Sequence, residues 1–240
     1  METAIVDRRR DLYRGKDPRE IPLYTVAEAA RYLHLPRATL RSWVDGRAYT
    51  AGGEERRSPR LIERPHPGDD RLSFSNLVEA HVLRALRVEH GVPMAQVRRA
   101  LDYAQKEFGI DRLLIREELR AAPGEVFLKE YGRLLSLSRS GQFAMERILD
   151  VFLRRLTRDV DGRPLRLYPF IASQSFEDGR VVSIDPRVAY GRPSIARKGI
   201  STAILAERVN AGESIRDLAS YYDLDEKEIE EAIVYEAVAA

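Results

Sequence analysis

The chain has 240 residues and a formal net charge of +2, and 44% of its residues are apolar while 32% are charged. Two or three small domains suit this length better than one large core. The absence of cysteine excludes disulfides, thiolate catalysis and cysteine-ligated zinc or iron–sulfur sites. Because the N-terminus is charged and no apolar run reaches the roughly 20 residues of a membrane span, we expect a cytoplasmic protein with no membrane partner.

Residues 1–20 are predicted to form a polar arm, since arginines are set among acidic residues along most of this stretch. We interpret the arm as a frayed terminus. A strand-like arm exchanged between two subunits is the alternative.

Residues 23–47 are predicted to form two short helices with a tight connection. Thr25 and Glu28 have the spacing of a capping box, which marks the start of the first helix. Proline cannot continue a helix but suits the first position of a new one, so the second helix is predicted over Pro36–Val44. In a helix-turn-helix the second helix enters the DNA major groove. An ordinary helical hairpin with a solvated arginine face would have the same pattern.

The predicted second helix has one apolar face and one polar face. Its residues predicted to face DNA are Arg37, Thr39, Arg41 and Ser42. Arg37 and Arg41 are the candidates for base edges, because a guanidinium can donate two parallel hydrogen bonds to guanine. Thr39 and Ser42 are expected to contact bases or phosphates.

A wing is predicted after these helices. Residues 48–59 are interpreted as a loop, and short strands at 60–64 and 71–73 flank a proline–glycine turn, as in a hairpin. The tip of a wing lies along the sugar–phosphate backbone. The candidate DNA contacts of this region are Arg56, Arg57, Arg60, Arg64 and Arg71, of which the last three are predicted phosphate contacts.

Two further helices are predicted over Phe74–Glu89, capped by Ser73, and over Met94–Phe108. His81 lies on the apolar face of the first. We interpret it as a packed core histidine, because no partner stands at metal-ligand spacing. The chain is therefore expected to hold no metal and no cofactor.

Residues 21–109 resemble the MerR-type winged helix-turn-helix. The matching stretches are YTVAEAARYLHLPRATLRSW and RLSFSNLVEAHVLRALRVEHGVPMAQVRRALDYA. The resemblance implies a DNA-binding domain. The chain departs from the family in its longer loop at 48–59 and in lacking the long coiled-coil helix that usually follows.

The middle region, residues 110–172, mixes strand and helix patterns. Strands are predicted at 113–116 and 165–170, a hairpin at 126–137 and a helix over Gln142–Leu156. We interpret the region as a small α+β scaffold or dimerisation unit. A ligand pocket, as in effector-sensing regulators, is the alternative.

Residues 173–240 are predicted to contain a polar linker, at 173–179, and three helices. Helices begin at about Thr202, after Ser214 and after Asp225, each with capping or stop signals. This is a trihelical, homeodomain-like unit. The predicted fold class is therefore mainly α with small β elements, that is, α+β.

Three motifs of this unit resemble an uncharacterised-domain family, number 433. They are Ile184-Asp-Pro186, Gly191-Arg-Pro-Ser-Ile195 and Ala211-Gly-Glu-Ser-Ile215, although Arg197-Lys-Gly199 replaces the usual Gly-Thr-Arg. Proteins of that family are often antitoxins encoded beside a PIN-like ribonuclease toxin, in VapBC-like modules. The resemblance therefore implies a toxin partner.

Charge argues against DNA binding by this second unit, because residues 213–240 contain nine acidic and two basic residues. We expect the last helix to contact a basic surface of the toxin instead. The candidate toxin-binding residues are Glu226, Glu230, Glu231, Val234, Tyr235 and Val238. A solvated acidic face, with the apolar residues in the unit's own core or in a dimer interface, is the alternative.

The sequence shows no nucleophile elbow, phosphate-binding glycine loop or histidine pair, so we expect no enzyme. The leading hypothesis is a homodimeric DNA-binding antitoxin that represses its own operon and neutralises a PIN-like ribonuclease toxin. The alternatives are a MerR-like transcription regulator that senses an effector through its middle region, without a toxin partner, and an oligomerising adaptor. Deletion of residues 213–240 is expected to abolish neutralisation and, if the dimer survives, to leave operator binding measurable.

Overall fold

The computed structural model describes residues 13, 15–88, 97–99, 101–103, 106, 112–115, 150–169 and 180–239. The hairpin predicted at 126–137 and the linker predicted at 173–179 lie outside these residues. The described part contains helices and three two-stranded sheets, which confirms the predicted α+β class. No helix in it is both long and apolar enough to cross a membrane.

The predicted helix pair is present as α2 (Val26–Tyr32) and α3 (Arg37–Asp45). The capping box is complete: Thr25 Oγ1 accepts from the Glu28 amide at 3.1 Å, and the Thr25 amide donates to the Glu28 carboxylate at 2.9 Å. The turn between the helices bends at His34, whose φ is 49°. Both helices pack on α4 (Phe74–Val88) around one apolar core. We call residues 21–88 the head.

The predicted wing is wrong in its position. The strands of the hairpin are β1 (Ala48–Ala51) and β2 (Glu54–Arg57), in the stretch interpreted as a loop. Gly52 and Gly53 connect them with φ of 64° and 81°, which suits a two-residue hairpin turn with two left-handed residues. Residues 60–73 are irregular, apart from a bridge between Leu72 and Tyr24. The Gly-Gly pair was the sequence signal for this hairpin.

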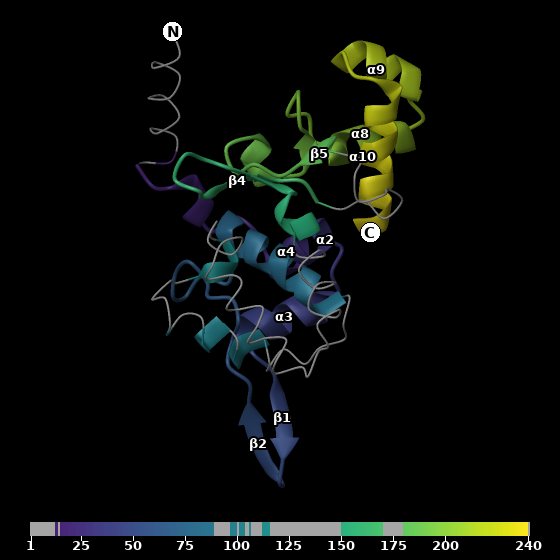
Figure 1. Ribbon diagram of the computed structural model, residues 1–240. Helices are drawn as coiled ribbons and strands as arrows, with labels where there is room; N and C mark the ends of the chain where they lie inside the picture. Colours follow the sequence, from purple (N-terminus) through teal and green to yellow (C-terminus); the bar gives the residue numbers. More distant parts are fainter. Residues whose placement is uncertain are drawn as a thin grey trace.

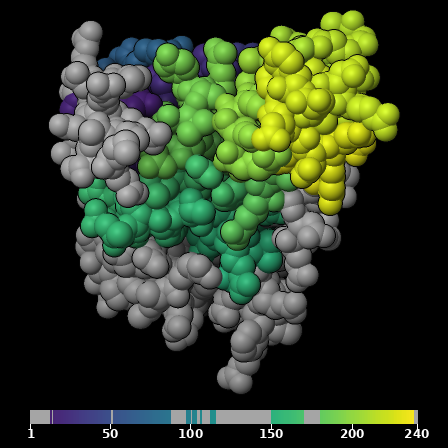
Figure 2. Space-filling view, turned by 90° about the horizontal axis from the view of Figure 1, so that it is seen from above, coloured from purple at the N-terminus to yellow at the C-terminus, as the bar shows by residue number. Residues whose placement is uncertain are grey.

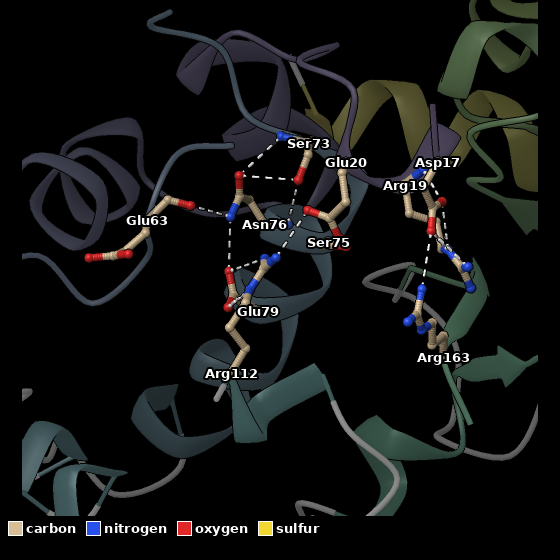
Figure 3. A network of polar contacts seen from close by, with 10 residues as sticks. All are labelled: Asp17, Arg19, Glu20, Glu63, Ser73, Ser75, Asn76, Glu79, Arg112 and Arg163. Atoms are coloured by element: carbon tan, nitrogen blue, oxygen red, sulfur yellow. Dashed lines mark hydrogen bonds and ion pairs between the residues drawn. The ribbon is translucent and has the colours of Figure 1, made fainter. Parts of the chain in front are cut away.

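A polar network ties the start of α4 to its neighbours (Figure 3). Ser73 Oγ accepts from the Asn76 amide at 3.2 Å, as predicted for a capping serine. Asn76 donates to Glu79, and Arg112 donates to both Glu79 oxygens at 2.8 and 3.0 Å and to Glu20 at 3.0 Å. The predicted strand at 113–116 is wrong, because residues Leu113–Ile115 form a 3-10 helix, η2, whose side chains are buried.

The N-terminal arm is held at its described residues. Residues Pro18–Glu20 form a 3-10 helix, η1, and Arg19 pairs with Asp159 at 2.5 Å. The Tyr13 hydroxyl donates to the Pro186 carbonyl at 2.9 Å. Residues 13 and 15–20 are therefore neither frayed nor a strand, contrary to both interpretations, because tertiary partners fix them.

The middle and C-terminal sheets are short. The chain is helical at 150–153, and the predicted helix ends there because residue 156 begins β3 (Leu156–Arg158), which pairs with β4 (Pro164–Leu167). β5 (Val182–Ser183) pairs with β6 (Ser194–Ile195). A bridge from Leu167 to Ile184 joins the two sheets.

The three predicted C-terminal helices are present as α8 (Thr202–Asn210), α9 (Ile215–Tyr222) and α10 (Glu226–Ala239). They enclose a separate apolar core that includes Leu205, Leu218 and Ile229. We call residues 180–239 the C-terminal unit. The hairpin β1–β2 projects from one end of the molecule, and α9 lies at the opposite end (Figure 1). From above, residues 150–169 and the start of the C-terminal unit lie side by side (Figure 2).

Candidate nucleic-acid interface

Helix α3 separates its apolar and basic side chains cleanly. Leu40, Trp43 and Val44 are at most 1% exposed, in the head core. Arg37 and Arg41, one helical turn apart on the other face, are exposed. Within the described part of the chain, neither guanidinium has a hydrogen-bond or ion-pair partner. Both are therefore available to a ligand.

Two smaller polar side chains accompany these arginines. Thr39 and Ser42 are half-buried, and the Ser42 hydroxyl donates to the Thr39 carbonyl at 2.7 Å. A serine hydroxyl has one proton and two acceptor lone pairs. While this bond is present, Ser42 can therefore only accept a hydrogen bond from a ligand.

The hairpin is fixed at the end of α3. Gly46 has φ of 74°, and a Cβ there would lie 2.2 Å from the Ser58 carbonyl oxygen, so only glycine fits without a shift. The Ser58 amide donates to the Arg47 carbonyl at 2.8 Å, and the Arg47 amide donates to Ser58 Oγ at 2.9 Å. The next residues return to the helix, where the amides of residues 61 and 62 donate to the Trp43 carbonyl. The orientation of the hairpin is therefore coupled to that of α3.

Arginines follow the hairpin and its base. Arg57 and Arg60 are exposed, and no partner occurs for either guanidinium among the described residues. Arg56 pairs with Glu54 at 3.3 Å, but both side chains are more than half exposed, so the pair holds Arg56 weakly. Tyr49, opposite Arg56 on β1, is 48% exposed.

Two of the predicted phosphate contacts already form ion pairs with carboxylates of this chain. Arg64 donates to Asp45 at 2.6 Å, at the C-terminal end of α3, and its side chain is 20% exposed. Arg71 pairs with Asp69 at 3.0 Å, and its hydrogen bonds hold the pKa of that carboxyl below its usual value. The structure therefore directs Arg64 toward α3. Arg47 and Tyr49, which were not among the predicted DNA contacts, lie exposed at the hairpin base and on β1.

A concavity lies between the start of α2 and the basic face of α3. Its lining residues are Thr25, Val26, Ala27, Arg37, Arg41, Asp45, Arg64 and Asp70. No side chain caps the first turn of α3 in the described structure, although the Thr39 amide already donates to the Pro36 carbonyl at 2.9 Å. This surface suits a phosphate or a base edge.

The predicted toxin-binding residues do not form one surface. Glu226 and Glu230 are exposed and Val234 is 36% exposed, as expected. Glu231 is 8% exposed, so its predicted outward position is wrong. Tyr235, predicted as an apolar anchor for the toxin, is 0% exposed and is already packed inside this chain. The Val238 side chain lies outside the described part.

Other carboxylates of α10 are paired rather than free. Arg197 binds Glu228 at 2.7 Å and, chiefly through this hydrogen bond, holds the pKa of that carboxyl below its usual value. Glu236 pairs with Arg31 of α2 at 2.8 Å. Fewer carboxylates of α10 are therefore available to a partner than the composition of residues 213–240 indicates.

His81 lies in the head core, as predicted. It is 1% exposed, and its Nε2 lies 3.1 Å from the Phe152 carbonyl oxygen. Burial lowers its pKa to about 3. No cluster of three or more His, Asp or Glu side chains that could hold a metal occurs in the residues that the structure describes.

Two family models match the chain. Residues 22–101 match "Putative DNA-binding HTH domain", and residues 182–235 match "Protein of unknown function (DUF433)". The first range covers the head, with α3 and the hairpin. The second covers most of the C-terminal unit.

Whole-chain relatives are also similar. "Putative antitoxin VapB45" of Mycobacterium tuberculosis is 32% identical over 92% of this chain and 95% of its own length. "Uncharacterized protein Rv2308" of the same organism is 23% identical over 89% of each chain. A crystal structure of Rv2018 from Mycobacterium tuberculosis superposes with a TM-score of 0.64 at 27% identity, and the match covers 89% of this chain and 98% of that one. The chain therefore belongs to the family of the "Putative antitoxin VapB45", with a helix-turn-helix domain at its N-terminus and a DUF433 domain at its C-terminus.

Proposed function

We propose that this chain is a DNA-binding antitoxin that represses its own operon and neutralises a PIN-like ribonuclease toxin. The observation that carries the proposal is the exposed pair Arg37 and Arg41 on α3, which have no partner among the described residues and lie beside a projecting hairpin, in a chain of this family. The proposal assigns the chain a binding role without catalysis.

DNA binding would use α3 and the hairpin together. With α3 in the major groove, Arg37 and Arg41 read base edges and Thr39 contacts a base or a phosphate. The hairpin lies along the backbone, where Arg57 and Arg60 contact phosphates. Arg64 is assigned a supporting role, since its pair with Asp45 connects the chain after the hairpin to α3.

The protein would act on DNA as a homodimer. One helix and one hairpin offer few contacts, and two-fold pairing of half-sites is a common solution to this problem. Sedimentation at micromolar concentration should therefore show a dimer, both alone and on a pseudo-palindromic site. A monomer under both conditions would contradict this part of the proposal.

The toxin contact is proposed for the exposed carboxylates of the C-terminal unit, Glu226 and Glu230. An RNA-cleaving enzyme is expected to carry basic residues around its cleft, so pairing with carboxylates is electrostatically favourable. Association should then slow as salt rises, because exposed charges are screened.

The test of the function combines the chain with the product of the adjacent gene. We expect the two proteins to co-purify, the chain to block the partner's cleavage of RNA, and the complex to bind the DNA upstream of the operon. The matched control is Arg37→Ala/Arg41→Ala, which should lose the DNA and still block cleavage. DNA binding without any protein partner would instead favour a transcription regulator that senses an effector.

A further inference from the structure

The last helix of the C-terminal unit reaches the helix-turn-helix. Tyr235 of α10 is completely buried, and its hydroxyl donates to the Tyr32 carbonyl at 2.9 Å. Tyr32 is the last residue of α2, and the final carbonyls of a helix have no partner within it. A residue 203 positions away in the sequence therefore satisfies the end of α2.

The same part of α10 contacts the turn that sets the angle between α2 and α3. The Tyr235 ring lies 4.9 Å from the His34 ring, centroid to centroid. His34 has the left-handed backbone conformation at which the chain changes direction. Beside it, Glu236 binds Arg31 of α2 at 2.8 Å and also accepts from Thr202 of α8. Helices α2, α8 and α10 are thus joined at one place.

A second contact joins the two parts through a motif of the C-terminal unit. Gly191 lies against the head, where a Cβ would be 2.3 Å from Tyr24 Oη and 3.3 Å from a Leu23 methyl carbon. Tyr24 is 2% exposed, just before α2. The close approach explains why glycine stands at this position of the motif.

These contacts involve α2 and the turn, not Arg37 or Arg41 themselves. The C-terminal unit extends away from the hairpin end of the molecule (Figure 1). Because α2 packs against α3, a displacement of α2 or of the turn reorients Arg37 and Arg41. The C-terminal unit can therefore influence DNA recognition without touching DNA.

We propose that Tyr235 is a positioning residue for DNA recognition, through which the C-terminal unit holds α2 and the turn in the orientation that α3 needs. This inference rests on the proposed DNA binding. It predicts that deletion of residues 213–240, which removes Tyr235, weakens operator binding. It also predicts a reciprocal effect, because coupling between two sites acts in both directions.

The experiment uses the full-length chain and double-stranded DNA that the wild type enriches from a random-sequence library. Tyr235→Ala should bind this DNA at least tenfold more weakly, and Tyr235→Phe, which loses only the hydroxyl, about threefold more weakly. Binding to scrambled DNA should change little. Tyr221→Ala, which alters a 72% exposed tyrosine of the same unit, is the matched control and should bind as the wild type does.

The ratio of specific to non-specific affinity separates positioning from simple loss of folded protein. Partial unfolding would lower both affinities alike, whereas misorientation of α3 lowers only the specific one. Gly191→Ala, which presses on Tyr24 from the other contact, should reproduce the change in the ratio and provides a second test if Tyr235→Ala does not fold.

Hydrogen exchange tests the positioning role of Tyr235 without measuring affinity. Without DNA, the backbone amides of α2 and the turn should exchange faster in Tyr235→Ala than in the wild type. Those of α4 should exchange at the same rate in both proteins. Addition of DNA should slow exchange in α10 of the wild type only. Equal affinity ratios in the wild type, Tyr235→Ala and Gly191→Ala would overturn the positioning role. Failure of the wild type to enrich any sequence would instead overturn the DNA-binding function itself.

Discussion

Helix α3 of the head and helix α10 of the C-terminal unit each follow a short connection from the preceding helix. The two helices differ in what their side chains contact. Helix α3 buries one face and leaves Arg37 and Arg41 exposed without partners in the described structure. Helix α10 buries Tyr235 against the head and pairs Glu236 with α2. Helix α3 therefore exposes positive charge to solvent, whereas the C-terminal part of α10 packs against the head.

This difference shows that a shared helical arrangement does not decide the role of a helix. Exposed cations suit the phosphate backbone, whereas the carboxylates of α10 would be repelled by it. The two units are thus assigned different roles, which we call the division: the head contains the candidate DNA surface, and the C-terminal unit fixes the orientation of α2 and the turn in the head. Four measurements test this division.

The largest effect is expected from the double variant Arg37→Ala/Arg41→Ala. Each bidentate arginine–guanine pair contributes about 1–3 kcal/mol of discrimination, so specific affinity should fall about a hundredfold or more. The matched control is Glu226→Ala/Glu230→Ala, which removes two exposed carboxylates at the same four-residue spacing in α10. Fluorescence anisotropy should show no loss for this control. Comparable losses in both variants would contradict the division.

The second effect compares one glycine in each part of the molecule. Gly46→Ala places a Cβ 2.2 Å from the Ser58 oxygen at a φ of 74°, whereas at Gly212, with φ of 99°, no atom of the described residues lies within 4 Å of the corresponding position. We expect Gly46→Ala to lower the free energy of unfolding by about 3 kcal/mol and Gly212→Ala by about 1 kcal/mol. Urea denaturation measures both, and equal costs would argue against a tight junction between α3 and the hairpin.

The third effect is a pH dependence confined to the head. Burial lowers the pKa of His81 to about 3, whereas the unfolded chain takes up this proton near pH 6.5. The free energy of unfolding should therefore fall by about 1.4 kcal/mol for each pH unit between about 6.5 and 3, or about 2 kcal/mol by pH 5. Trp43, the only tryptophan and 1% exposed in the head core, reports this unfolding by fluorescence.

His81→Gln keeps a hydrogen-bond donor but does not titrate, so it should remove most of this slope above pH 5. The C-terminal unit contains no histidine. The pKa of Glu228 is lowered by its hydrogen bond to Arg197, so stability from this pair is present above about pH 4.5 and is lost only as the pH falls further. An unchanged slope in His81→Gln would show that other groups govern the response.

The smallest effect separates two arginines near the hairpin. Arg57→Ala should weaken binding similarly to all DNA sequences and reduce the slope of log affinity against log salt by about 1, as expected for one phosphate contact. Arg64→Ala should leave that slope unchanged, because Asp45 already holds its guanidinium. A reduced slope in Arg64→Ala would restore this residue as a phosphate contact.

Local signals in the sequence determined most helices of this protein. The capping box of Thr25 and Glu28, the proline at 36 and the cap at Ser214 all act over three or four residues, and the structure contains the three helix starts that they predict within a residue. The outward direction of Arg37 and Arg41 followed from helical spacing alone. The hairpin signal at Gly52-Gly53 was also local, and the prediction missed it in favour of a turn at 65–70.

Only the tertiary structure decided which charged and apolar side chains remain available. Arg64, Glu231 and Tyr235 look like surface residues in the sequence, but one is paired with Asp45 and the other two are buried. The partner of the Tyr235 hydroxyl lies 203 positions away, and helical periodicity cannot indicate which other element covers a given face. Residue type set the sign of the charge on α3 and on α10, and burial against a distant element decided which side chains of α10 remain available.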